Sequence, residues 1–266
     1  MIFLGTECYD VILTTRDVIE KLSNHCTSQQ GLTIMRKTIG VIGGLGAPSS
    51  ALFHKYLVEQ CQIQVGRTED YPHIFIYDFP ASDITECGVD SDATKSMLET
   101  IASAIARLEK SGIDLLTIPC NTAFVFFDEL CSFTHTPILN IVEEVAQRIQ
   151  KDKHRQVGIL ATSATVTSEV YKKSFNEFDI ELISPNVKQQ QQIDRIITKI
   201  DQGNAVAEDR RFLESIINYF ESEFSATAIV IACTCIPVLL GDFDHELCSI
   251  YDSLFVYAES SIARTI

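Results

Sequence analysis

Residues 37–50, KTIGVIGGLGAPSS, decide the fold class of this chain. The apolar run from Thr38 to Ile42 is typical of a buried strand, and the small residues that follow are typical of a turn. Pro48 then favours the first turn of a helix, because its fixed φ suits that position. A strand, a glycine-rich turn and a helix in this order are typical of α/β proteins.

Short apolar runs and longer helical patterns alternate along the rest of the chain, which predicts βαβ units and mainly parallel sheets. We expect strands at residues 38–43, 73–79, 114–119, 156–161, 180–184 and 228–233. The spacing of apolar positions predicts helices over 49–62, 93–111, 141–151, 165–178, 187–200, 208–222 and 249–263.

The two halves of the chain form a weak internal repeat. In the first half, Cys120 stands at the end of a strand, 81 residues after Ile39, and in the second half Cys233 stands 76 residues after Val157. The repeat predicts an α/β fold with two pseudo-symmetric, doubly wound lobes. Ligands of such sheets bind beyond the carboxyl ends of the strands, so both cysteines are expected to face one cleft between the lobes.

The domain boundaries follow from this pattern. We expect an N-terminal extension over residues 1–36, with a short helix at 17–22, and a first lobe over 37–140. The second lobe is predicted over 141–246, and a C-terminal helix, 247–266, is expected to join the first lobe. The extension could be a start-site artefact or a non-catalytic appendage.

Composition limits the partners and the compartment. The formal charge of −15, from 21 Lys and Arg against 36 Asp and Glu, disfavours nucleic acid, so a small-molecule substrate is expected. Nine cysteines without regular spacing, and no secretory signal, predict free thiols in the reducing cytoplasm. No apolar run approaches the roughly 20 residues of a membrane-spanning helix, so no membrane association is expected.

Two opposed thiols suit one particular reaction, the inversion of an acidic carbon centre. One group removes a proton from one face and a second group returns a proton to the other face. Cys120 stands where a strand leads into a helix, and the N–H groups there are expected to favour its thiolate. We therefore predict Cys120 and Cys233 as catalytic acid and base.

Polar residues beside the cysteines are candidates for binding a substrate carboxylate. Asn121 and Thr122 follow Cys120, Thr234 follows Cys233, and the turn around Gly44 lets backbone approach a small anion. No motif indicates a pyridoxal lysine, so no cofactor is expected.

Other interpretations of these motifs are weaker. The glycine-rich turn lacks the last glycine of a dinucleotide-binding motif, because Ser49 stands in its place. Cys233, Cys235 and Cys120 could bind a metal, but a zinc site usually has four ligands at recognisable spacing, so none is expected.

Four motifs in order, IGVIGGLGAPSS, IPCNTAF, VGILATSATVTSEVY and ACTCIP, resemble those of the aspartate/glutamate racemase family over about residues 37–266. The resemblance implies a pyridoxal-independent racemase with two α/β lobes, and a homodimer. It implies that Cys120 and Cys233 are catalytic. It also implies that the polar residues contacting the α-carboxylate and amino groups of the substrate are Asn121, Thr122, Thr165 and Thr234.

The chain departs from the family where side-chain recognition is expected. Ala47, Phe124 and Cys235 replace the usual proline, histidine and glutamate, and Ile84 stands where an arginine typically holds a distal carboxylate. Without that arginine an acidic substrate loses its partner, so a neutral or basic amino acid is equally open.

The sequence is therefore compatible with three functions. The first is a cofactor-independent amino-acid racemase or epimerase, an isomerase. The second is a related cysteine enzyme acting on another carbon acid of the hydantoin, malonate or maleate type. The third is a degenerate member that binds a small ligand without turnover.

Overall fold

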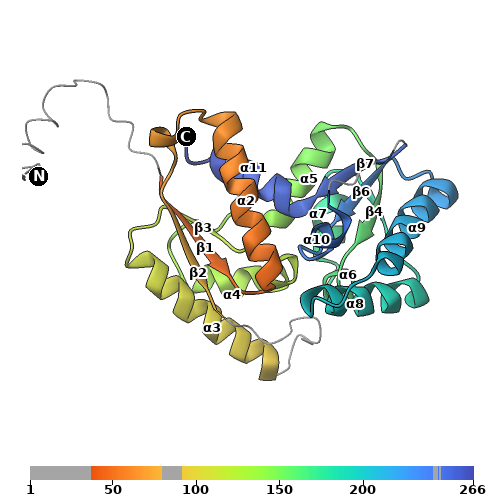
Figure 1. Ribbon diagram of the computed structural model, residues 1–266, viewed down its shortest axis with the longest axis horizontal. Helices are drawn as coiled ribbons and strands as arrows, with labels where there is room; N and C mark the ends of the chain where they lie inside the picture. The colour runs from red at the N-terminus through yellow and green to blue at the C-terminus, as the bar shows by residue number, and fades with distance from the viewer. Residues whose placement is uncertain (1–36, 80–91, 242–244, 246) are drawn as a thin grey trace, which may run out of the picture. The chain divides into compact units, whose positions relative to one another are not determined.

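The computed structural model describes residues 37–79, 92–241, 245 and 247–266 (Figure 1). Residues 36–266 pack as one compact unit. The helix predicted at 17–22 and the position of Ile84 lie outside the described residues.

Two parallel sheets confirm the predicted α/β class. The first sheet has the order β2-β1-β3 and the second the order β5-β4-β6-β7, with every neighbouring pair parallel. In both sheets the strand that comes first in its half lies between the second and the third, which is the topology that an internal repeat predicts. The strands are β1 (Ile39–Gly43), β2 (Ile74–Asp78), β3 (Leu115–Thr117), β4 (Gln156–Leu160), β5 (Glu181–Ile183), β6 (Ala228–Ile231) and β7 (Ser249–Asp252).

Helices connect the strands of both sheets. In the described ranges, none has both the length and the apolar character needed to cross a bilayer. They are α2 (Ala47–Gln64), α3 (Asp92–Glu109), α4 (Phe127–Ser132), α5 (Ile141–Lys151), α6 (Ser163–Thr167), α7 (Val170–Asn176), α8 (Val187–Asp201), α9 (Ala207–Phe224), α10 (Ile236–Leu240) and α11 (Ser253–Ala263), with short 3-10 helices η1 (Thr68–Asp70) and η2 (Asn121–Phe126).

Local sequence signals explain where several helices begin. Pro48 stands in the first turn of α2, and proline is tolerated there because its missing N–H would have no helical partner. The side chain of Asn140 accepts a hydrogen bond from the N–H of Val142 at the start of α5. Asn186 and Gln189 form a capping box at the start of α8, which satisfies two helix donors reciprocally.

Two predicted helices differ from the structure. The helix expected over 165–178 is divided into α6 and α7, because Glu169 adopts a left-handed backbone conformation with φ 58°. The helix expected over 249–263 begins only at Ser253. Its first four residues pair with β6 as strand β7, and Asp252 then caps α11 by accepting from the N–H of Leu254.

Alternate residues of the second sheet face two different groups of helices. Val157, Ile159 and Val230 belong to a core that includes residues of α5, α7 and α11. Leu160, Ile229 and their neighbours belong to a second core with α8 and α9. A parallel sheet covered on both faces in this way is doubly wound, as predicted.

The first of these cores also contains the strands and helices of the first sheet, so the two halves share one apolar interior. Helix α11 packs against α2 of the first half and against α5. The predicted lobe limits 37–140 and 141–246, with 247–266 returning to the first lobe, remain a prediction.

Gly44 occupies a position that no other residue suits. Its φ is +92°, and a Cβ atom added there would lie 1.8 Å from the carbonyl oxygen of Phe79. The neighbour is backbone and follows directly on β2, so it cannot move aside as a flexible side chain would.

We expect Gly44→Ala to lower the free energy of unfolding by about 2–5 kcal/mol, the sum of backbone strain and overpacking. Gly66→Ala is the matched control, because Gly66 also has a positive φ, 83°, but a Cβ there would meet nothing within 4 Å. Urea denaturation of both variants measures the difference. Equal losses of stability would mean that the contact with Phe79 contributes nothing.

Candidate active site

Cys120 lies at the junction between β3 and η2, where it is the N-terminal cap residue of the 3-10 helix. Its thiol is almost completely buried, with 5% of the residue exposed. The backbone N–H groups of Thr122 and Ala123 lie where they lower the pKa of the thiol. The strand end and the following helical turn therefore orient Cys120 as the sequence predicted.

The prediction that this environment favours the Cys120 thiolate is wrong. Burial raises the pKa of the thiol from its ordinary value of 9.0 to about 12, and the two N–H donors offset only part of that effect. Negative charge on Cys233 and Asp201 raises it further. At neutral pH Cys120 is therefore a neutral thiol, which is the form that returns a proton.

Cys233 follows β6, and its charge is among the causes that raise the pKa of Cys120. It is 6% exposed. The two cysteines come from equivalent positions in the two sheets, at the carboxyl ends of β3 and β6. That both thiols face one substrate remains a prediction.

Asn121 is fixed by hydrogen bonds at both ends of its amide. Its nitrogen donates to the hydroxyl of Ser253 at 2.9 Å, and its oxygen accepts from the hydroxyl of Tyr171 at 2.6 Å. Tyr171 is buried, and burial raises its pKa, so it remains a donor at physiological pH. Tyr171 falls in the helix predicted over 165–178, and no sequence signal pointed to its part in orienting Asn121.

Thr122 and Thr165 meet in a buried cluster of hydroxyl groups. The Thr122 hydroxyl lies 3.1 Å from those of Thr162 and Thr165, and the last two lie 3.0 Å apart. Thr162, which the sequence analysis did not single out, also caps α6 by accepting from the N–H of Thr165. The cluster joins η2 of the first half to α6 of the second.

Two further predicted binding residues lie beside these elements. Thr234 is buried next to Cys233, with 4% exposed. The N–H of Gly44 donates to the hydroxyl of Ser50 at 2.8 Å, so this donor already has a partner inside the protein. The close backbone approach that Gly44 permits is to Phe79 of the chain itself.

Phe124 is a core residue and offers no surface to a ligand. It is 1% exposed, and its ring stacks on Phe127 at a centroid distance of 5.7 Å and meets the edge of Tyr257 at 6.3 Å. The phenylalanine that replaces the family's usual histidine therefore packs in the protein core.

Cys235 makes two side-chain hydrogen bonds that the sequence did not predict. Its sulfur donates to a carboxylate oxygen of Asp201 at 2.8 Å and lies 3.3 Å from the hydroxyl of Ser49. The C-x-C spacing pointed to Cys235, but no sequence signal linked it to Asp201, 34 residues away.

Metal binding finds no support in the described part of the chain. There, no group of three or more His, Cys, Asp or Glu side chains is arranged to hold an ion. All six described cysteines are free.

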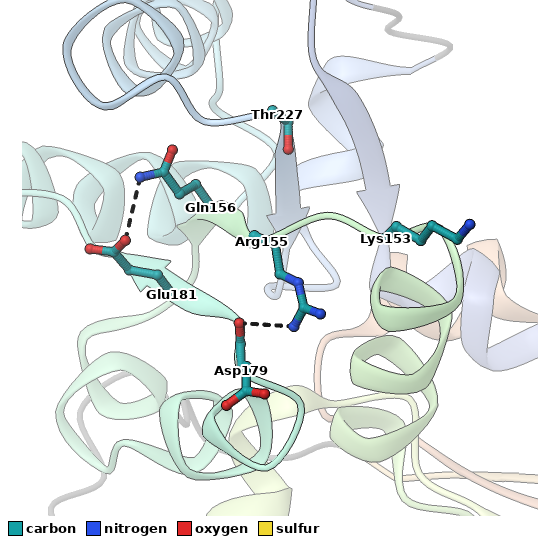
Figure 2. A pocket seen from close by; sticks show the side chains of 6 residues that line it. All are labelled: Lys153, Arg155, Gln156, Asp179, Glu181 and Thr227. Atoms are coloured by element: carbon teal, nitrogen blue, oxygen red, sulfur yellow. Dashed lines mark hydrogen bonds between the residues drawn. The ribbon is translucent and has the colours of Figure 1, made fainter.

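A cavity of about 600 Å³ lies elsewhere in the second half (Figure 2). Gln156 and Glu181 open strands β4 and β5, and Thr227 precedes β6, so the cavity is at the amino ends of the strands. Figure 2 shows the guanidinium group of Arg155 bonded to the backbone of Asp179 rather than reaching for a ligand. The cysteines follow the carboxyl ends, so this cavity is separate from the candidate active site.

The fold defines a class, the α/β proteins built from two similar parallel-sheet halves, and each half here ends its third strand near a buried cysteine. A family model described as Asp/Glu/Hydantoin racemase matches residues 42–259. The chain therefore belongs to the Asp/Glu/Hydantoin racemase family.

Individual relatives agree with this assignment. The chain is 30% identical to the broad specificity amino-acid racemase RacX of Bacillus subtilis over 227 residues, covering 85% of this chain and 96% of that protein. The structure of an aspartate racemase from Picrophilus torridus superposes with a TM-score of 0.73 at 25% identity, covering 86% and 94% of the two chains. An aspartate racemase homologue from Pyrococcus horikoshii shares the fold, with a TM-score of 0.71, 23% identity and coverage of 86% and 99%.

Proposed function

We propose that this protein is a cofactor-independent amino-acid racemase or epimerase that uses Cys120 and Cys233 as its two acid/base groups. The observation that carries the proposal is that each half supplies a buried cysteine at the carboxyl end of an equivalent strand, Cys120 after β3 and Cys233 after β6. Family membership supports the same reaction class.

The reaction needs one thiolate and one thiol. The thiolate removes the α-proton from one face of the substrate, and the electron pair left on carbon spreads into the carboxylate. The thiol on the other face then gives its proton to the same carbon and becomes the thiolate. The product has the opposite hand, and the two sulfurs have exchanged protonation states, which proton exchange with water restores.

The hydroxyl and amide groups around the thiols would hold the substrate carboxylate and stabilise its developing charge. Thr122, Thr165 and Thr234 offer donors from both halves of the chain. Asn121 contributes its amide, and Gly44 keeps the neighbouring turn compact. Because the threonine hydroxyls are bonded to one another, the carboxylate would replace bonds within the cluster.

We propose a neutral or basic amino acid as substrate. Ile84 stands where an arginine would hold a second carboxylate, and the carboxylate of Asp201 accepts a hydrogen bond from Cys235, two residues beyond Cys233. Negative charge at this place disfavours an acidic side chain. The relative from Bacillus subtilis is named as a racemase of broad specificity, which is consistent with this choice.

A hydantoin or a similar carbon acid is the second candidate substrate. The family description includes hydantoin racemases, and the same pair of thiols could invert such a ring carbon.

Solvent exchange at the α-carbon tests the proposal. The protein is incubated in deuterium oxide, without pyridoxal phosphate, with both enantiomers of each amino acid and with a 5-substituted hydantoin. We expect loss of the α-proton signal in proton NMR spectra, with inversion, for neutral or basic amino acids. Exchange confined to the hydantoin would favour the second candidate, and thermal stabilisation by a ligand without any exchange would indicate a binding protein.

We further propose a homodimer working in the reducing cytoplasm. The six described cysteines are free thiols, as that compartment allows. Light scattering coupled to size-exclusion chromatography measures the assembly, and a mass of one chain, 29.7 kDa, would contradict a dimer.

A further inference from the structure

A second cavity, of about 260 Å³, lies at the carboxyl ends of β4 and β5, where α6 meets α7. The two short helices are divided at Glu169 by its left-handed backbone, and residues from both of them line the cavity. Neither Cys120 nor Cys233 is among the lining residues. The cavity is therefore distinct from the space at the two thiols, although it lies at the end of the sheet where ligands of parallel sheets usually bind.

Part of the lining is apolar. It consists of Ile159 on β4, Val166 on α6 and Leu182 on β5. Ile159 is fully buried, and the other two are half-buried. Sites for drug-sized ligands measure roughly 300–1,000 Å³, so this smaller cavity suits a molecule about the size of one amino acid. Its apolar lining favours a hydrocarbon side chain on that molecule.

Two opposite charges also line the cavity. The ammonium nitrogen of Lys172 lies 2.7 Å from a carboxylate oxygen of Glu169, and the two side chains are 56% and 51% exposed. An ion pair exposed to this extent contributes little to stability, so a ligand that carries both charges can replace it at small cost. The ligand's ammonium group would bind Glu169, and its carboxylate would bind Lys172 and the hydroxyl of Ser184. A zwitterion with an apolar side chain therefore matches the whole lining.

Two buried residues of the lining lead to the candidate active site. The hydroxyl of Tyr171 donates to the amide oxygen of Asn121 at 2.6 Å, and the hydroxyl of Thr165 lies 3.1 Å from that of Thr122. A ligand packed against Tyr171 and Thr165 would hold both in place. Because a substrate carboxylate has to replace bonds within the threonine cluster, fixing Thr165 opposes substrate binding.

We propose that this cavity is a second binding site, for a free amino acid with an apolar side chain, and that its occupancy weakens the binding of substrate at the candidate active site. Binding in the cavity does not depend on the reaction. The effect on substrate rests on the racemase proposed above, and by linkage substrate must weaken binding in the cavity by the same factor.

Isothermal titration calorimetry with L-leucine tests the second site. Lys172→Gln removes the partner of the carboxylate and should weaken the binding of leucine there by about 5- to 10-fold, the factor for one charged hydrogen bond near the surface. Lys173→Gln is the matched control, because Lys173 is also exposed on α7 but does not line the cavity, and it should bind as the wild type does.

Leucinamide, which lacks the carboxylate, separates the contact from a general effect of the substitution. It should bind the wild type more weakly than leucine does, and Lys172→Gln should not weaken it further. No binding of leucine to the wild type, equal affinities in the wild type and Lys172→Gln, or equal losses in Lys172→Gln and Lys173→Gln would overturn the second site.

Steady-state kinetics test the effect on the active site. With an apolar amino acid that the enzyme racemises, wild-type rates should rise less steeply with concentration than simple saturation predicts, because a second molecule weakens binding of the first by about 5-fold or more. Lys172→Gln should come closer to simple saturation, whereas Lys173→Gln should match the wild type. Simple saturation in the wild type would overturn the effect on substrate. Leucine binding that depends on Lys172 in a protein without turnover would remove the racemase and leave the second site.

Discussion

Replacing either Cys120 or Cys233 with serine should lower the rate of racemisation by about 10²- to 10⁴-fold, the usual contribution of a positioned acid or base. Serine keeps nearly the size of the side chain and leaves the backbone around residue 120 unchanged. What it loses is acidity, because an alkoxide is far harder to form than a thiolate. Circular dichroism of the enantiomer mixture over time measures the rate.

The double variant sharpens this test. If the two thiols act in one reaction, Cys120→Ser with Cys233→Ser should be little slower than either single variant, since residues that act as a unit are not additive. Cys131→Ser, at an exposed position on α4, is the matched control and should keep wild-type activity. A single variant at either position that retained the full rate would eliminate the two-thiol reaction.

Alkaline pH should destabilise the protein through Cys120. In the unfolded chain this thiol ionises near its ordinary value of 9.0, whereas burial in the folded protein raises its pKa to about 12. Base therefore favours the unfolded state, and stability is lost as the pH rises between these two values. The slope is about 1.4 kcal/mol per pH unit, so Cys120 should account for about 3 kcal/mol of lost stability between pH 8 and pH 11.

Urea denaturation of the wild type and of Cys120→Ser over this pH range isolates the effect. Serine does not ionise, so the stability of the variant should fall less steeply. Tyr171 and Tyr257, whose pKa values burial also raises, destabilise both proteins equally and cancel in the comparison. Parallel curves for the two proteins would mean that Cys120 is already ionised, or solvated, in the folded state.

The fold could be predicted because its signals are local. The apolar runs before Gly43 and before Thr162 are both typical of a strand followed by a turn. The internal repeat agrees with the strand order that the two sheets share. Helix 141–151 was predicted to the residue, since Asn140 caps it and apolar positions recur with helical spacing.

The errors occurred where tertiary structure overrides local pattern. Residues Ser249–Asp252 include apolar residues that are compatible with either a helix or a strand. They form a strand because they pair with the edge of β6. Glu169 interrupts a helical pattern through its left-handed backbone, for which glutamate gives no sequence signal.

The site was predicted in part for the same reason. Both thiols and the threonines lie within motifs, so their positions could be inferred from spacing. Tyr171 and Asp201 act through hydrogen bonds that depend on how helices pack, and no local pattern reports such contacts. The ionisation of Cys120 was mispredicted because helix-end donors are visible in sequence, whereas the depth of burial is not.

The burial of both sulfurs affects how the protein binds small molecules and how fast its thiols are oxidised. With only 5% and 6% of these residues exposed, a small molecule can contact both sulfurs fully only when the surrounding elements separate. The fraction of time that these elements spend separated scales the apparent affinity for any small-molecule ligand. The same fraction scales the rate at which peroxides oxidise the two sulfurs. A protein that opens rarely therefore binds its ligand more weakly, but it also keeps its two thiols reduced for longer.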